Sequence, residues 1–191
     1  MKMSKKEDIK LNIPNLISLA RLICVPLTVW LILNGEMLFA FWVFVSAGIS
    51  DAVDGFIAKR FNLQTELGAY LDPIADKALL VSVFVTLGQA GYIESWLVLL
   101  VVFRDGLILC GAILYHFIHH DLTIEPLLIS KVNTTTQFAL ATLVLGLTGY
   151  NIADGEIIKS LVYIVAATTV LSGAAYVGIW GMRAATMEPG E

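Results

Sequence analysis

Six apolar segments separated by short joints constrain this chain more than any other feature of its sequence. They run approximately over residues 17–34, 38–58, 68–90, 96–117, 128–149 and 157–182. Each is close to the roughly 20 apolar residues that a helix needs to cross the hydrocarbon core of a bilayer. Charged residues make up only 15% of the 191 residues, against about 25% in soluble domains. We therefore expect an all-α, integral membrane protein with six transmembrane helices in a single domain, residues 1–191.

Positive charges predict the orientation of these spans. Basic residues gather before the first span, between the second and third, between the fourth and fifth, and after the sixth. They are Lys2, Lys5, Lys6, Lys10, Lys59, Arg60, His116, His119, His120, Lys131 and Arg183. Because basic joints stay on the cytoplasmic side, we expect both termini in the cytoplasm. The segment from Met1 to Pro14 is expected to form a short amphipathic helix on the membrane surface.

Four aspartates lie at one depth in this arrangement. Asp51 and Asp54 fall near the cytoplasmic end of the second span, and Asp72 and Asp76 near the cytoplasmic start of the third. Spacings of three and four residues place each pair on one helix face. Carboxylates within a membrane are unfavourable unless they are compensated. Because oxygen donors without His or Cys suit Mg²⁺ or Mn²⁺, the pattern predicts a metal site for phosphate-bearing substrates.

Two other interpretations of the aspartates remain open. Single aspartates cap helices, as Asp51 after Ser50 or Asp72 before Pro73 would in a soluble protein. Intramembrane carboxylates also mark ion pathways, so a carrier or channel for divalent cations is the alternative from another functional class. The acids cluster at one depth and form no ladder toward the opposite face. This clustering favours the metal site.

The residues around the aspartates resemble the signature of the CDP-alcohol phosphotransferase family. Asp51-Ala-Val-Asp54-Gly55-Phe-Ile-Ala58-Lys59 is followed, eight residues later, by Gly68-Ala-Tyr-Leu-Asp72-Pro-Ile-Ala-Asp76. The pattern fixes four Asp, two Gly and one Ala over 26 positions. Most members of the family have Arg where this chain has Lys59. The six-helix layout of the family covers the whole chain.

The resemblance implies a phospholipid-synthesising enzyme that transfers a phosphatidyl group from CDP-diacylglycerol to an acceptor hydroxyl and releases CMP. It implies that two ions, Mg²⁺ or Mn²⁺, are bound by Asp51, Asp54, Asp72 and Asp76, and that Asp76 is also the general base. The residues that it places at the CDP-lipid pocket are Asp51, Gly55, Ala58, Lys59 and Gly68. It further implies a homodimer, in a bacterial inner membrane or the inner membrane of an organelle.

Polar residues outside the signature are candidates for binding the acceptor. Cations near a four-aspartate site would recruit an anionic substrate. The candidates for its phosphate are Arg21, Arg104, Lys131 and Asn133. Two alternatives stay open, because Arg104 and Asp105 would also join helices as a neutralised pair, and Lys131 would also extend to the membrane surface.

The identity of the acceptor follows from similarity to two branches of the family. Residues 12–21 are similar to the start of both phosphatidylglycerophosphate synthases and CMP-forming cardiolipin synthases. Residues 130–137 and the Arg104-Asp105 pair look more like the cardiolipin synthases, because the other branch more often has a second Lys at position 133 and Arg-Glu at positions 104–105. One fewer cation fits phosphatidylglycerol, which carries a single phosphodiester. We expect this acceptor, with glycerol 3-phosphate as the alternative and no nucleic-acid partner.

Overall fold

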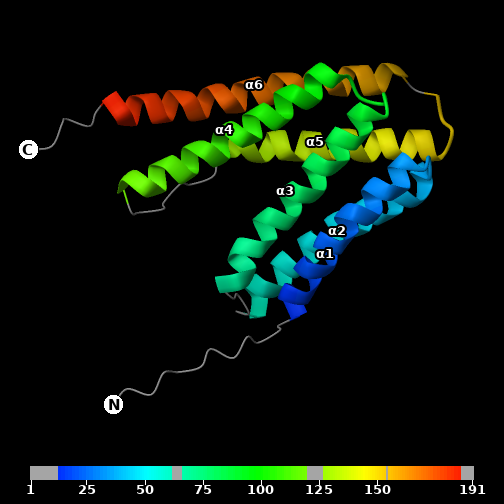
Figure 1. The fold of residues 1–191 in the computed structure, drawn as a ribbon, viewed down its shortest axis with the longest axis horizontal. Helices are drawn as coiled ribbons and strands as arrows, with labels where there is room; N and C mark the ends of the chain where they lie inside the picture. The colour runs from blue at the N-terminus through cyan, green and yellow to red at the C-terminus, as the bar shows by residue number, and fades with distance from the viewer. Residues whose placement is uncertain (1–12, 62–65, 120–126, 154, 186–191) are drawn as a thin grey trace, which may run out of the picture.

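The structure, a computed structural model, describes residues 13–61, 66–119, 127–153 and 155–185. These residues form six α-helices and no strand (Figure 1). The helices are α1 (Ile13–Leu33), α2 (Met37–Phe61), α3 (Glu66–Gln89), α4 (Ser95–His119), α5 (Leu128–Gly149) and α6 (Gly155–Ala185). Every boundary lies within four residues of its predicted position, so the all-α fold with six helices is confirmed. The surface helix predicted from Met1 to Pro14 lies almost wholly outside the described residues.

Three helices end in the same left-handed turn. After α1, Gly35 adopts φ 79°, and the backbone N–H of Glu36 donates to the carbonyl of Leu31 at 2.9 Å. Gly91 after α3 (φ 81°) and Asn151 after α5 (φ 57°) repeat the arrangement. A residue in this conformation lets the backbone turn back and satisfy the last carbonyls of the helix, and glycine adopts it without steric cost. Short joints therefore pair α1 with α2, α3 with α4, and α5 with α6 in antiparallel order, with all three turns at one end.

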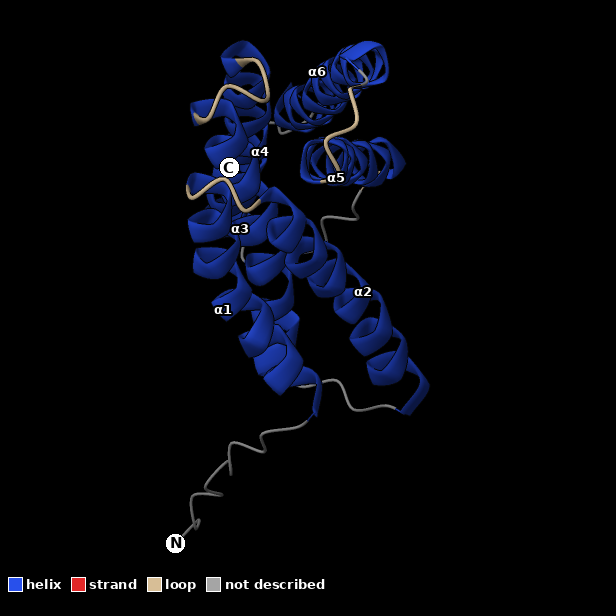
Figure 2. Ribbon diagram, turned by 90° about the vertical axis from the view of Figure 1, so that its right-hand side faces the viewer, coloured by secondary structure: helices blue, strands red, loops and turns tan. Residues whose placement is uncertain are grey.

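The helices pack in two groups that share one interface. α1 packs against α2 and α3, whereas α6 packs against α4 and α5, and α2 contacts α5 between the groups. Figure 2 views α5 and α6 nearly along their axes while α1, α2 and α3 are seen from the side. The two groups are therefore inclined to each other.

Buried side chains separate by polarity along the helices. Toward the end with the three turns the core is apolar and includes Ile32, Phe44, Phe84, Leu87, Leu97, Leu140 and Leu145. The buried arginines and amides lie nearer the middle or in the opposite half of their helices: Arg21, Arg104, Asn133 and Gln137. A buried polar side chain is unfavourable unless it has a hydrogen-bonding or ionic partner. We therefore expect a ligand to bind in this half of the molecule.

One helical stretch among the described residues has the length and composition to cross a membrane. It is Glu156–Ile179 of α6, with a mean hydropathy of 1.7. Two shorter apolar stretches cover Ile17–Leu33 of α1 and Met37–Asp51 of α2.

Candidate active site

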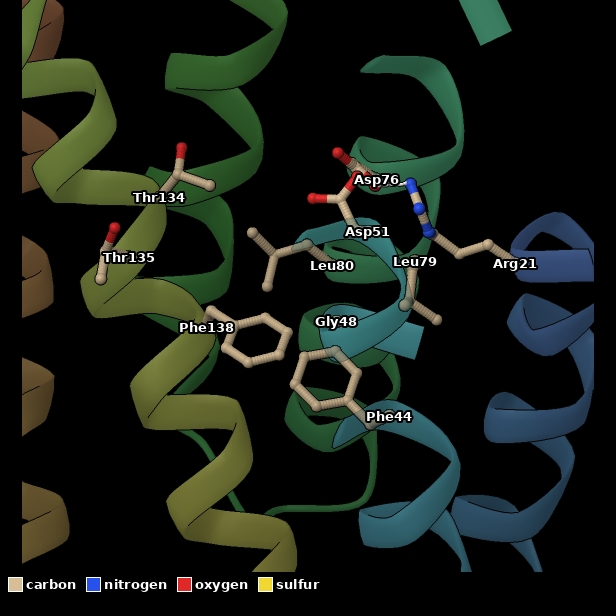
Figure 3. A pocket seen from close by; sticks show the side chains of 10 residues that line it. All are labelled: Arg21, Phe44, Gly48, Asp51, Asp76, Leu79, Leu80, Thr134, Thr135 and Phe138. Atoms are coloured by element: carbon tan, nitrogen blue, oxygen red, sulfur yellow. Dashed lines mark hydrogen bonds and ion pairs between the residues drawn. The ribbon is translucent and has the colours of Figure 1, made fainter. Parts of the chain in front are cut away.

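Two of the signature aspartates meet at one arginine. The Nη1 atom of Arg21, on α1, lies 2.9 Å from Oδ1 of Asp51, on α2, and also donates to Oδ1 of Asp76, on α3. The Arg21 side chain is buried, whereas those of both aspartates are half-exposed. Three neighbouring helices thus bring two carboxylates onto one guanidinium (Figure 3). One cation cannot neutralise both, so the cluster keeps a negative charge.

The other signature residues lie on the same two helices. Asp54 follows Asp51 by three residues on α2, and Asp72 precedes Asp76 by four on α3. Their side chains lie outside the described part of the structure. So do the side chains expected at the CDP-lipid pocket beyond Asp51, at Gly55, Ala58, Lys59 and Gly68. The roles of these residues stay predictions.

A cavity of about 260 Å³ opens beside the two aspartates, between α1, α2, α3 and α5. Its polar edge is formed by Arg21, Asp51, Asp76, Thr134 and Thr135, and its apolar wall by Phe44, Gly48, Leu79, Leu80 and Phe138. Figure 3 shows the charged groups above the two phenyl rings, with the threonines across from them on α5. A cavity with one polar edge and one apolar wall suits an amphipathic ligand.

A stacked pair of rings closes the apolar wall. The centroids of Phe44 and Phe138 lie 4.6 Å apart, with 23° between the ring planes. The Phe138 ring reaches this position because Gly48 has no side chain. A Cβ atom at Gly48 would overlap Cζ of Phe138 and lie 2.8 Å from its Cε2. The sequence carried no pattern that singled out these three residues, since their roles depend on the approach of α5 to α2.

The second buried arginine connects α4 to α5 and α6. Arg104 is 3% exposed, and its Nη2 donates to Oγ of Ser130 at 2.7 Å and to Oγ of Ser172. Its guanidinium carbon also lies 6.0 Å from the ring centroid of Tyr176. No sequence pattern indicated Ser172 and Tyr176 as partners of Arg104. Arg104 therefore joins three helices. A role in joining helices was the alternative to phosphate binding that the sequence left open for Arg104.

An ion-pair chain continues from Arg104 to α3. Asp105 receives Nη1 of Arg104 on Oδ1 at 2.7 Å and Nζ of Lys77 on Oδ2 at 2.8 Å. Lys77 directly follows Asp76 in α3. The two carboxylate oxygens of Asp105 thus hold two different cations, one from each helix group.

The remaining acceptor candidates do not line the cavity. Asn133 is fully buried, and its Oδ1 accepts hydrogen bonds from the hydroxyls of Thr168 (2.9 Å) and Thr169 (2.8 Å) on α6. Its Nδ2 has no partner among the described residues, and neither does the side-chain amide of Gln137. Lys131 is exposed in the first turn of α5. Arg104 does not line the cavity either. Of the four acceptor candidates, only Arg21 therefore lies beside the aspartates.

The two carboxylates at the cavity are oxygen ligands of the kind that divalent cations take. Carboxylates from two helices face one cavity, and the cluster with Arg21 is left with a net negative charge. Within the described residues, no group of three His, Cys, Asp or Glu side chains could hold a metal ion. Asp54 and Asp72 would supply the further oxygens, since helical spacing puts them one turn from Asp51 and Asp76.

Comparison with known proteins assigns the family. The chain is 31% identical over 189 residues to a probable CMP-forming cardiolipin synthase of Drosophila melanogaster, covering 91% of this chain and 58% of the relative. It is 34% identical over 184 residues to chloroplastic CDP-diacylglycerol–glycerol-3-phosphate 3-phosphatidyltransferase 1 of Oryza sativa, covering 87% and 56%. A CDP-diacylglycerol–glycerol-3-phosphate 3-phosphatidyltransferase of Rickettsia bellii is 32% identical over 170 residues, covering 86% of this chain and 93% of the relative.

The chain thus spans a little more than half the length of the fly and rice relatives and nearly all of the Rickettsia relative. The sequence profile described as CDP-alcohol phosphatidyltransferase matches residues 11–180, which include the whole signature and parts of all six helices. The chain therefore belongs to the CDP-alcohol phosphatidyltransferase family.

Proposed function

We propose that this protein transfers a phosphatidyl group from CDP-diacylglycerol to an acceptor hydroxyl and releases CMP. One observation carries the proposal: Asp51 and Asp76 converge on Arg21 at the polar edge of a cavity whose other wall is apolar. A lipid with a charged diphosphate head group has the matching division into polar and apolar parts. Family membership supports the reaction and disfavours the cation carrier or channel.

We also propose that the chain forms one integral membrane domain with six spans. Large apolar side chains are exposed on every helix, and such a surface is unfavourable in water. Examples are Ile23, Phe39, Ile74, Phe103, Leu128 and Tyr163. The distribution of basic residues supports a cytoplasmic location of both termini and the aspartates. The membrane proposed from the family resemblance is a bacterial inner membrane or the inner membrane of an organelle. The homodimer expected from the family resemblance stays a prediction.

The four aspartates hold the metal in this proposal. Asp51, Asp54, Asp72 and Asp76 bind Mg²⁺ or Mn²⁺, in two positions. The bound ions would neutralise the diphosphate and stabilise CMP as the leaving group. The residues proposed to line the cytidine-diphosphate pocket are Gly55, Ala58, Lys59 and Gly68.

The protein's own groups then position and deprotonate the acceptor. Asp76 takes the proton of the acceptor hydroxyl, whose oxygen forms a bond to the β-phosphorus, the one bonded to diacylglycerol. The bond from that phosphorus to the bridging oxygen breaks, and its electron pair leaves with CMP. Arg21 holds Asp51 and Asp76 side by side, so the base and a metal ligand keep a constant geometry.

Phosphatidylglycerol is the proposed acceptor, and glycerol 3-phosphate is the alternative. The residues proposed to bind the acceptor phosphate are Arg21, Arg104, Lys131 and Asn133, of which Arg21 lies at the cavity edge. Asn133 supports phosphatidylglycerol because a neutral amide occupies the position where glycerophosphate enzymes more often have Lys. Relatives named for the two activities have comparable identities to the chain, 31% and 34%, so overall identity does not favour either acceptor.

The assay that tests the reaction uses purified protein in lipid–detergent micelles. We expect release of CMP from CDP-diacylglycerol that requires Mg²⁺ or Mn²⁺ and an acceptor. Phosphatidylglycerol and glycerol 3-phosphate are offered separately, and the lipid product is identified by mass. Metal flux into liposomes without CMP release would contradict the transferase, and exclusive use of glycerol 3-phosphate would contradict the proposed acceptor.

The role of Asp76 as the base is tested by Asp76→Asn. Loss of a general base lowers turnover by about 10²- to 10⁴-fold, and we expect binding of the CDP-lipid to be largely retained. Glu36→Gln is the matched control, because it also replaces a carboxylate by an amide, at an exposed turn between α1 and α2. Normal turnover of Asp76→Asn would exclude Asp76 as the base.

A further inference from the structure

The hydroxyl of Thr134, on the polar edge of the cavity, makes no hydrogen bond with any residue that the structure describes. A threonine inside a helix usually donates to a main-chain carbonyl one turn earlier. Three other threonines of α5 do so at 2.8–2.9 Å, namely Thr135, Thr136 and Thr142. Thr134 therefore keeps both the donor and the acceptor of its hydroxyl for a ligand.

Thr134 lies opposite the charged groups of the cavity. It is half-buried on α5, and Figure 3 shows it across from Asp51 and Asp76, at about their height. The charged groups of the cavity edge come from α1, α2 and α3, whereas the polar groups that α5 supplies are threonine hydroxyls. A ligand between the two sides therefore meets carboxylates on one side and an uncharged hydrogen-bonding group on the other.

Both proposed acceptors present a glycerol group with two free hydroxyls. One of them attacks the phosphorus, and the other, on the neighbouring carbon, does not react. A hydroxyl that leaves water without gaining a hydrogen bond is unfavourable. The non-reacting hydroxyl therefore needs a partner in the cavity, and a threonine hydroxyl can donate to it or accept from it.

We propose that Thr134 is a specificity-determining residue, whose hydroxyl binds the non-reacting hydroxyl of a glycerol acceptor while Asp76 receives the proton of the reacting one. The inference rests on the proposed function and deepens it, because it makes a diol head group, rather than any primary alcohol, the preferred acceptor class. It applies equally to phosphatidylglycerol and to glycerol 3-phosphate. Thr134 itself forms and breaks no covalent bond.

A comparison of two acceptors tests the inference. The first is whichever of phosphatidylglycerol and glycerol 3-phosphate the wild type uses, so the choice between them does not enter. The second is its deoxy analogue, in which 1,3-propanediol replaces glycerol and the non-reacting hydroxyl is lost. The measured quantity is the diol preference, defined as kcat/KM for the glycerol acceptor divided by kcat/KM for the analogue. A purely structural effect of a substitution changes both values alike and leaves the diol preference unchanged.

Thr134→Val replaces the hydroxyl by a methyl group of similar size. We expect it to lower the diol preference about three- to tenfold, which corresponds to one neutral hydrogen bond. Thr134→Ser keeps the hydroxyl and should stay within about twofold of the wild type. Thr142→Val, on the same helix but outside the cavity, is the matched control and should leave the diol preference unchanged. Thr134→Ala also removes the hydroxyl and favours the helix, so it gives the same comparison if Thr134→Val does not fold.

The outcomes separate this inference from the proposed function. An active Thr134→Val or Thr134→Ala with the diol preference of the wild type overturns the role of Thr134 alone, and so does an equal fall in Thr134→Ser. A fall in Thr135→Val without one in Thr134→Val also overturns it. So does a wild type that uses the analogue as well as the glycerol acceptor. An analogue that no variant turns over overturns it too, because one hydrogen bond cannot account for so large a loss. Absence of CMP release from the wild type with either glycerol acceptor overturns the proposed function instead.

Discussion

Substitution of Gly48 by alanine tests the packing that shapes the cavity wall. The new Cβ would overlap Cζ of Phe138 and lie 2.8 Å from its Cε2, whereas carbon atoms pack best at about 3.5–4.0 Å. The ring cannot retreat freely, because it is stacked on Phe44 at 4.6 Å. Overpacking of this kind lowers the free energy of unfolding by about 1–3 kcal/mol, and loss of the stack removes about 0.5–1.5 kcal/mol more. The better helix propensity of alanine offsets about 1 kcal/mol, so we expect a net loss of about 0.5–3.5 kcal/mol.

The measurement is thermal unfolding of the purified protein in one detergent. A loss of this size should lower Tm by roughly 1–14 °C, at about 2–4 °C per kcal/mol for a chain of this length. Gly178→Ala on α6 is the control, since nothing lies within 4 Å of a Cβ built there. KM for CDP-diacylglycerol should rise severalfold in Gly48→Ala with kcat nearly unchanged, because Asp51 and Asp76 are not displaced. Equal Tm values for the two alanine variants would refute the packing argument.

Three further perturbations have defined outcomes. Gly149→Ala should lower Tm more than Gly48→Ala, because its Cβ would lie 2.8 Å from the backbone N and Cα of Leu38, which cannot rotate away; KM for the CDP-lipid should stay unchanged. Arg21→Met leaves two half-exposed carboxylates without their cation, and solvent screening keeps the cost below the value of about 3–5 kcal/mol for a fully buried pair; this loss of thermal stability should shrink when Mg²⁺ is added. Removal of divalent metal by a chelator should stop CMP release reversibly, and activity that persists in excess chelator would contradict the metal site.

The positions of the helices and the clustering of the aspartates were predictable from the sequence, because both depend on local patterns. Apolar runs of bilayer length and the turn residues at Gly35 and Gly91 define the helices. The spacing of Asp51 and Asp76 within their spans placed them at one depth, and they share Arg21. The sequence therefore predicts which half of the molecule carries the charges.

Packing between distant helices was not predictable in the same way. Gly48 and Phe138 are 90 residues apart, and nothing in either local sequence indicates that a ring on α5 fills the space over a glycine on α2. The partners of Arg104 show the same limit. Ser172 is an ordinary small residue of an apolar span, and only the crossing of α4 and α6 gives it a function.

Helix α3 carries one residue of the aspartate cluster at Arg21 and one residue of the ion-pair chain that includes Arg104. This arrangement bears on how acceptors differ within the family. Asp76 contacts Arg21 on α1, and Lys77, about 100° further around the helix, contacts Asp105 on α4. In the proposed function, the aspartates can therefore keep one geometry for the CDP-lipid while substitutions on α4, α5 and α6 change the proposed acceptor site. Such a division would explain why the chain resembles relatives named for either acceptor to a similar degree, at 31% and 34% identity. If it holds, Lys131→Gln should change the ratio of kcat/KM for the two acceptors while the requirement for metal and for CDP-diacylglycerol stays the same.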